Sequence, residues 1–388
     1  MFENYHINRL NIRIIIYALA LSTIGVMLIY SATNRTTFYA DYYKKQIMGI
    51  AIGIVCMLVM ILINYKFILK MWPFIYAFNA ALLILTLTNG SVHGGAKRWL
   101  VIPVIGSIQP SDFTKLFMVI CLSALIGVFF GRFGEIKTWF YVMLMVTPVI
   151  FLILKQPDLS TTILLTAMVV VMLYVAKISY KIIAGVALFI LPFAGYFIFF
   201  LVSHTKEELI VIASEQYQLK RVLSFIWPDL FQDSIYQQHN SVMAIGSGGL
   251  LGKGLNTTTF ESVKNGNYIS ESHTDFIFTI AGEELGFVGC VIIIILLLLI
   301  VAEVMLIAKN ADTPAGRSIC VGFATMYAMQ TFINIAVATW MMPNTGLPLP
   351  FISYGLSSII SMYISIGIVL NIGLQRPQKK KNDIIDIQ

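Results

Sequence analysis

The sequence predicts an all-α polytopic membrane protein with about ten transmembrane helices and one large extracellular loop, over residues about 203–273. The chain has 388 residues, of which 58% are hydrophobic and 12% are charged, and its mean hydropathy is +0.83. Soluble domains carry about twice that share of charged residues. The apolar residues form continuous runs that do not alternate as barrel strands do. We therefore predict a single membrane domain covering residues 1–388.

The predicted spans follow the apolar runs in chain order. Each run is close to the roughly 20 residues that a helix needs to cross a bilayer. The eighth run is longer, so that helix can tilt or project beyond the hydrocarbon. The ten predicted spans are 13–31, 46–64, 71–88, 110–130, 138–156, 158–176, 181–202, 274–308, 316–341 and 350–374.

Composition argues against several other classes of protein. The four cysteines lie in apolar runs without a CxxC or histidine pairing, so a disulfide or metal framework is not expected. No small-residue cleavage site follows the first apolar run, which therefore reads as a membrane helix and not as a cleaved signal. The net charge is +7, but the basic residues are scattered through short loops, so we expect no nucleic-acid partner.

Lysine and arginine predict the orientation. With ten spans both termini lie on one side, and the short loops and ends on that side carry fourteen basic residues against seven on the other. Short loops rich in lysine and arginine stay in the cytoplasm. We therefore expect a multi-pass protein of a bacterial cytoplasmic membrane, with both termini cytoplasmic and loop 203–273 outside.

Asp275 is the predicted catalytic residue. Ser272 and Thr274 are suitable N-cap residues, so we expect Asp275 in the first turn of the eighth helix. A lone aspartate there often only complements the helix dipole, but the dipole also favours the ionised form that a general base needs. Glu283 and Glu284 lie about 12–13 Å deeper on other faces, so we expect them to be structural.

Basic residues near the outer side are candidates for binding a negatively charged substrate. Lys97 and Arg98 suit an interfacial helix with Trp99 at the level of the headgroups. Lys115 falls inside the fourth span, where an unpaired ammonium is costly. It either pairs with a carboxylate or a phosphate, or extends to the interface.

The stretch "LKQPDLSTT" breaks one apolar run and restarts another. Asp158 is expected to cap the new helix after Pro157, and the cap is either purely structural or part of a polar site together with Lys155.

Two further segments suggest irregular backbone. "GSGGLLGKG" lacks the spacing of a nucleotide-binding P-loop, but its glycines would let the backbone approach a ligand or a lipid headgroup. Residues 340–358 contain three prolines and predict a broken, extended start to the last span. Irregular backbone at membrane depth occurs where it lines protein or a cavity.

Seven stretches together resemble the SEDS family of bacterial cell-wall proteins (shape, elongation, division and sporulation), which includes RodA and FtsW. In chain order they are "KRWL", "IGSIQPSDFTKL", "QPDLST", "YQLKR", "AIGSGGLLGKGL", "ESHTDFIFTIAGEELGFVG" and "GLPLPFISYG". "GSIQPS" and "GLPLPF" look closer to the elongation branch, RodA. Leu356 in place of a usual glycine, Asp112 in place of a usual glutamate and the unusual "ATWMMPNTG" depart from the family pattern.

The resemblance implies a peptidoglycan glycosyltransferase that polymerises lipid II outside the cytoplasmic membrane, with Asp275 matching the essential aspartate of the family. Acting as a general base in a single inverting displacement, Asp275 would take a proton from the acceptor sugar. Cations would neutralise the departing undecaprenyl pyrophosphate, and a divalent ion, Mg²⁺ or Mn²⁺, is a further candidate for this role. The predicted substrate-binding residues are Lys97, Arg98, Lys115, Lys155, Asp158, Arg221, His273 and Ser353.

The resemblance also implies a partner, a class B penicillin-binding protein that crosslinks the new glycan. Three alternatives stay open at this point. The chain could act in division or sporulation, as FtsW or SpoVE; it could be a lipid flippase or transporter, which intramembrane carboxylates and broken helices suit equally; or it could be a scaffold that only recruits a synthase.

Overall fold

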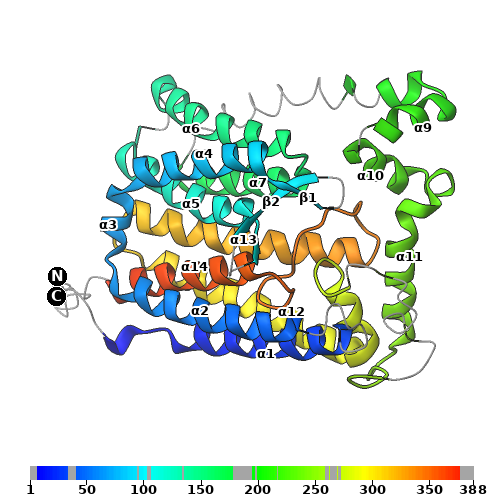
Figure 1. The fold of residues 1–388 in the computed structure, drawn as a ribbon. Helices are drawn as coiled ribbons and strands as arrows, with labels where there is room; N and C mark the ends of the chain where they lie inside the picture. The colour runs from blue at the N-terminus through cyan, green and yellow to red at the C-terminus, as the bar shows by residue number, and fades with distance from the viewer. Residues whose placement is uncertain are drawn as a thin grey trace, which may run out of the picture.

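The computed structural model is a bundle of long helices with a smaller helical group at one end (Figure 1). The structure describes residues 7–33, 41–93, 96–102, 106–132, 135–177, 195–196, 199–215, 217–257, 262, 269 and 272–375. The long helices are α1 (Ile12–Thr33), α2 (Tyr42–Leu62), α4 (Trp72–Asn89), α5 (Pro110–Val128), α6 (Ile136–Lys155), α7 (Leu159–Val175), α12 (Ile277–Lys309), α13 (Pro314–Ala338) and α14 (Leu356–Leu374). Two short elements, η1 (Ile7–Arg9) and α3 (Tyr65–Lys70), lie at the end of the bundle where α1 begins.

The predicted membrane architecture is confirmed. Among the described residues, eight helices are long and apolar enough to cross a bilayer, and they coincide with eight of the ten predicted spans. The span predicted at 158–176 is the shorter apolar helix α7, of 17 residues. The span predicted at 181–202 lies largely outside the described residues.

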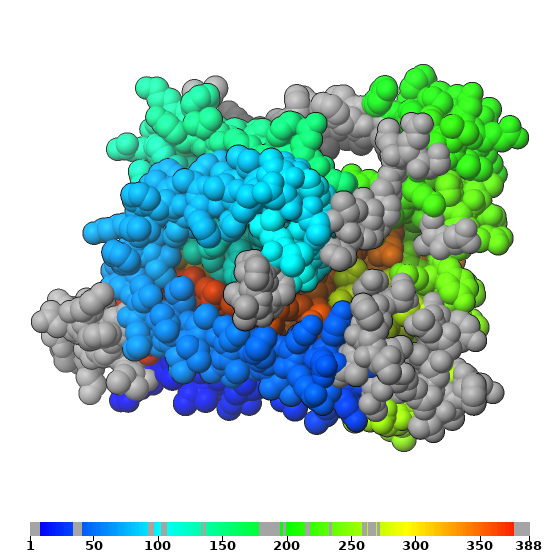
Figure 2. All heavy atoms as spheres, in the orientation of Figure 1, coloured from blue at the N-terminus to red at the C-terminus, as the bar shows by residue number. Residues whose placement is uncertain are grey.

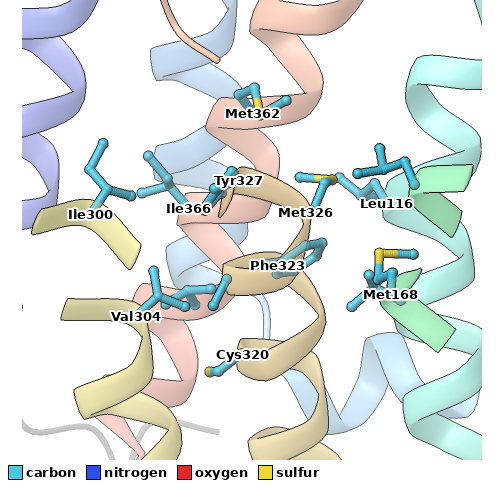
Figure 3. Packing of buried hydrophobic residues seen from close by; sticks show 14 of the residues in the cluster. Leu116, Met168, Ile300, Val304, Cys320, Phe323, Met326, Tyr327, Met362 and Ile366 are labelled. Atoms are coloured by element: carbon cyan, nitrogen blue, oxygen red, sulfur yellow. The ribbon is translucent and has the colours of Figure 1, made fainter. Parts of the chain in front are cut away.

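Helix α13 is the centre of the core. It packs against α5, α7, α12 and α14, and Figure 3 shows Phe323, Met326 and Tyr327 of α13 among side chains of those neighbours. Helix α14 is almost wholly buried and packs mainly against α2, and on the face seen in Figure 2 only a narrow red and orange strip shows above the blue α2. Helices α2 and α4 instead bury few of their side chains and leave about half of the apolar ones exposed, as suits helices that face lipid.

The predicted long loop is mostly helical. It contains α9 (Lys206–Glu215), α10 (Tyr217–Ile226), η2 (Pro228–Leu230) and α11 (Gln232–Ser247), which stand together at one end of the bundle (Figure 1). The first residue of α1 and the last of α14 lie at the opposite end.

The prediction of an interfacial helix at Lys97 and Arg98 is wrong. Both residues lie on β2 (Ala96–Ile102), the central strand of an antiparallel sheet with β1 (Ser91–His93) and β3 (Gly106–Ile108). The β-branched residues Val101 and Ile102 favour a strand, and pairing on both sides satisfies the backbone of β2. Arg98 is thereby placed on a hydrogen-bonded strand beside the end of α6.

Helix α12 is broken at Gly286, whose φ of 66° and ψ of −165° are not helical. The glycine-rich loop 248–254 packs against this break. Its backbone accepts hydrogen bonds from Phe287 and Val288 and donates to the carbonyl oxygens of Glu283 and Glu284, at 2.9–3.2 Å. The backbone of this loop therefore makes a close approach, as expected, but it contacts the broken helix α12 and not a ligand or a lipid headgroup. The remaining 23 or so residues after the break are about 34 Å long, close to the hydrocarbon thickness.

Candidate active site

Asp275 lies in a turn, residues 272–276, that precedes α12. Helix α12 begins at Ile277, so the expectation that Asp275 occupies its first turn is wrong by two residues. Tertiary hydrogen bonds hold this turn. Ser353 Oγ donates to the carbonyl oxygen of Thr274 at 2.6 Å, and Asn334 Nδ2 donates to that of Asp275 at 2.8 Å. These bonds fix the backbone on both sides of a carboxylate that stays half-exposed.

The segment between α13 and α14 forms one side of the site. It is irregular from Thr339 to Gly355, as predicted. Asn334 also donates to the carbonyl oxygen of Leu347 at 2.7 Å, so one amide ties this segment to the Asp275 turn. Gly346 has a φ of +76°, and a Cβ there would lie 3.1 Å from Asp275 Oδ2 and 3.8 Å from Arg221 Nη1. Asp275 and Arg221 therefore flank the same glycine, and a side chain at 346 would crowd both.

Arg98 is held against the turn between α6 and α7. Its Nε donates to the carbonyl oxygen of Gln156 at 3.1 Å, a second nitrogen donates to that of Pro157, and Nη1 lies 3.8 Å from Asp158 Oδ1. Only 13% of the Arg98 side chain is exposed. Two backbone carbonyl oxygens and the Asp158 carboxylate thus orient the guanidinium.

Arg98 and Arg221 line one pocket, which we call the Arg98–Arg221 pocket. About 300 Å³ of empty space lies along it, the open mouth included. Its other polar lining residues are Ser160, Gln218, Asn344 and Thr345. Because Thr345 precedes Gly346, the pocket is next to the carboxylate of Asp275.

The remaining predicted cations do not line this pocket. Lys115 is buried and pairs with Asp112 at 2.7 Å, which confirms the expected carboxylate partner. Lys97 donates to the carbonyl oxygen of Thr88 at 2.6 Å, near the end of α4. Lys155 is exposed, with its ammonium 5.5 Å from the ring centre of Phe151.

Asp158 is the predicted helix cap. Its carboxylate accepts from the Thr161 backbone at 3.1 Å and from the Thr161 hydroxyl at 3.0 Å, and it also lies near Ser111 and Arg98. With its side chain buried and so engaged, Asp158 positions the start of α7 and the Arg98 guanidinium.

His273 and Ser353 support the Asp275 turn from below. The His273 ring packs against Tyr42 and Tyr354, which stack on each other at 4.5 Å. Burial lowers the pKa of His273 to about 4, so the ring is neutral at pH 7. Ser353 Oγ also accepts from the backbone N–H of Leu349 at 2.8 Å. His273 belongs to this turn and Ser353 is hydrogen-bonded to it, and neither residue lines the pocket.

The deeper carboxylates are structural, as expected. Glu283 is fully buried and pairs with Lys253 at 2.9 Å, with Ser262 Oγ at 3.2 Å from its other oxygen. Glu284 accepts from Ser31 Oγ at 2.6 Å. These bonds join the broken start of α12 to the glycine-rich loop and to α1.

The site does not suit a divalent cation held by the protein. Among the described residues, no three acidic, histidine or cysteine side chains gather as a metal site would require. The guanidinium of Arg221 lies beside Asp275, and its positive charge would repel a metal cation at this position. The Mg²⁺ or Mn²⁺ considered from the sequence therefore enters no step below.

The sequence interpretation missed Asn334 and Gly346. Asn334 is 1% exposed in a mostly apolar helix, and a polar side chain at that depth is itself a signal. Gly346 was noted only as part of a broken segment, because nothing in the sequence showed which side chains would approach it.

Comparisons with known proteins agree with this architecture. The family described as "Cell cycle protein", of FtsW, RodA and SpoVE, matches residues 12–378. A probable peptidoglycan glycosyltransferase FtsW of Trichlorobacter lovleyi is 31% identical over 369 residues, 92% of each chain. Stage V sporulation protein E of Bacillus subtilis is 31% identical over 373 residues, 92% of this chain and 95% of the other.

Solved structures share the fold. A chain from a study titled "Structural coordination of polymerization and crosslinking by a peptidoglycan synthase complex" is 25% identical with a TM-score of 0.75, covering 97% of this chain and 99% of the other. The rod shape determining protein RodA of Thermus thermophilus is 23% identical with a TM-score of 0.66 over the same shares. From these matches and the fold, the chain belongs to the FtsW/RodA/SpoVE, or SEDS, family.

Proposed function

We propose that the chain is a peptidoglycan glycosyltransferase that polymerises lipid II at the outer face of the cytoplasmic membrane. One observation carries the proposal: a half-exposed carboxylate, Asp275, flanks the same glycine as the Arg221 guanidinium, beside a pocket that Arg98 also lines. A base next to two fixed cations suits a sugar transfer with a diphosphate leaving group. The names of the FtsW relatives support the same activity.

In this mechanism Asp275 takes the proton from the 4-hydroxyl of the acceptor sugar. The oxygen attacks the anomeric carbon of the donor, the bond from that carbon to the diphosphate oxygen breaks, and the configuration inverts. Arg98 and Arg221 neutralise the undecaprenyl pyrophosphate, so it leaves without being protonated. Both guanidiniums stay charged at any physiological pH and can bind two phosphate oxygens at once.

Lys97, Lys115 and Lys155 take no part in this mechanism. Each ammonium has another partner: a carbonyl oxygen, a carboxylate and an aromatic ring. Asp158, His273 and Ser353 act as positioning residues for Arg98 and for the Asp275 turn.

Polymerisation of lipid II by the purified protein in detergent tests the proposal. We expect Asp275→Asn to reduce the rate by at least about 100-fold, because it removes the general base and keeps the shape of the side chain. Asp229→Asn is the matched control, an exposed aspartate on η2 in the same end group, and should keep the wild-type rate. An unchanged rate in Asp275→Asn would refute the role of Asp275. A wild-type protein that moves lipid II across vesicles but forms no glycan would be a flippase instead.

Cell elongation is the role that the "GSIQPS" and "GLPLPF" stretches favour over division or sporulation. The sequence relatives given above are FtsW and SpoVE proteins and do not favour elongation. Depleting the protein in cells therefore tests whether it acts in elongation or in division. Rounded cells would support elongation, and filaments would support division.

The proposed partner is a class B penicillin-binding protein. The similarity to a chain from a synthase complex that couples polymerisation to crosslinking supports such a partnership. Co-purification of the two proteins from the native membrane, with the rate of polymerisation measured before and after they are combined, tests it.

For the orientation we propose cytoplasmic termini and an exterior Asp275. The end of the bundle where α1 begins carries Lys66, Lys70, Lys309 and Arg317, with Lys66 joined to Asp312 at 3.6 Å. The positive-inside rule puts this end in the cytoplasm.

A further inference from the structure

One wall of the Arg98–Arg221 pocket is neutral and lacks hydrogen-bond partners. Within the part of the chain that the structure describes, three buried atoms of lining residues have no partner: Gln218 Nε2, Asn344 Oδ1 and Thr345 Oγ1. Buried polar atoms are nearly always paired, and an unpaired one costs free energy. Three around a single pocket indicate groups that a ligand satisfies.

The Thr345 hydroxyl has no partner although the backbone of Thr345 is held in place. The residue is only 6% exposed. Its backbone carbonyl oxygen accepts from Ser160 Oγ at the start of α7, so the main chain is held in place while the hydroxyl is left unpaired. The main chain of the segment is also tied near this point through Asn334 and Leu347.

The three atoms define the chemistry of their ligand. Gln218 offers a donor, Asn344 an acceptor, and the Thr345 hydroxyl can serve as either. A phosphate has no donor when ionised and a cation has no acceptor, so neither satisfies the set. A secondary carboxamide does, because its carbonyl accepts and its N–H donates.

We propose that this wall binds a carboxamide of the lipid-linked substrate and thereby selects for it. The inference rests on the proposed function. Because Gly346 follows Thr345, a bound carboxamide is held next to Asp275 and Arg221, where it orients the sugar for proton removal. The carboxamide belongs either to an acetamido group on the sugar or to the attached peptide.

Thr345→Val tests this assignment with little risk to folding. Valine has the shape of threonine, and the Thr345 hydroxyl has no protein partner in the described structure to lose. We expect an unchanged or higher melting temperature and a fall in kcat/KM of about five- to tenfold, the size of one neutral hydrogen bond. Thr345→Ser should restore kcat/KM. Thr166→Val is the control, an exposed threonine on α7 outside the pocket, and should match the wild type.

Three substrates separate the sources of the carboxamide. They are the natural lipid-linked disaccharide, an analogue with hydroxyls in place of the acetamido groups, and an analogue without the peptide. We expect the Thr345→Val defect to disappear on one of the two analogues, which identifies the source. An equal defect on all three substrates, or none on any, would overturn the inference while leaving the glycosyltransferase activity standing.

Affinity measured in the Asp275→Asn background separates this inference from the proposed function. If the wild type forms no glycan but Thr345→Val weakens binding only of the two substrates that carry the recognised carboxamide, the inference holds and the proposed function fails. Equal binding of all three substrates with and without the Thr345 hydroxyl would refute the inference whatever the activity.

Discussion

His273, two residues before Asp275, makes the turn that carries the proposed base sensitive to acid. Its pKa is about 4 in the fold because burial disfavours the charged ring, against about 6.5 in an unfolded chain. The unfolded state therefore binds the proton first, and stability is lost as the pH falls from 6.5 towards 4. We expect a loss of about 2 kcal/mol by pH 5.

Melting temperatures in detergent between pH 7.5 and 5 measure this effect. The wild type should lose stability more steeply than His273→Phe, which keeps an aromatic ring between Tyr42 and Tyr354 but does not titrate. Parallel pH profiles for the two proteins would contradict a neutral His273.

Lys253 stabilises a carboxylate that has no exposure to solvent. Its side chain is 23% exposed, and its ammonium lies 2.9 Å from a carboxylate oxygen of the fully buried Glu283. Removing the cation from a buried pair costs about 3–5 kcal/mol, whereas removing both charges costs far less. We expect Lys253→Met to lower the melting temperature strongly and Lys253→Met with Glu283→Gln to recover most of the loss. A double variant no more stable than the single one would show that the pair is not what stabilises this region.

At the scale of elements, the break in α12 depends on one glycine. Gly286 adopts a φ and ψ that are essentially restricted to glycine, and a Cβ there would lie 2.3 Å from the backbone nitrogen of Gly252. Gly286→Ala should therefore cost more than about 3 kcal/mol, since it combines strain with a backbone clash. Thermal unfolding in detergent measures it.

Gly246→Ala is the matched control for this substitution. Gly246 lies in α11, and a Cβ there meets nothing within 4 Å. Alanine in a helix is about 0.5–1 kcal/mol better than glycine, so this variant should be as stable as the wild type or slightly more stable. Equal behaviour of the two variants would contradict a specific need for glycine at the break.

The elements differ in how far local sequence predicts them. Apolar length predicted the crossings because the bilayer demands it of each helix separately. The break at Gly286 depends on loop 248–254, which is distant in sequence, and the strand at Arg98 depends on pairing with the neighbouring β1 and β3, so hydropathy could not show them. The start of α12 was misplaced for the same reason, since Asn334 and Ser353 hold the preceding turn.

For the whole molecule, the sequence predicts that many charges gather on one side of the membrane, which we propose is the outer side, but not which of them meet. Arg98 and Arg221, 123 positions apart, line one pocket next to Asp275 only because the sheet and α10 bring them there. The spacing alone could have excluded Lys115 and Lys155 as substrate-binding residues. Asp112 is three residues before Lys115, and Phe151 is four before Lys155, which are the separations of neighbours on a helix.

The orientation of the whole chain decides whether Asp275 can reach a substrate outside the cell. Helix α12 joins the end group of α9–α11 to the end of the bundle that carries Lys309, so the two ends lie on opposite sides of the membrane. The excess of lysine and arginine assigns the Lys309 end to the cytoplasm. In a variant with all four cysteines replaced, Glu207→Cys should react with a membrane-impermeant maleimide on intact cells, and Lys309→Cys should react only after permeabilisation. Both positions are exposed, so reactivity reports sidedness and not burial. The opposite labelling pattern would place Asp275 on the cytoplasmic side, where exported lipid II could not reach it, and the proposed activity would fail with the orientation.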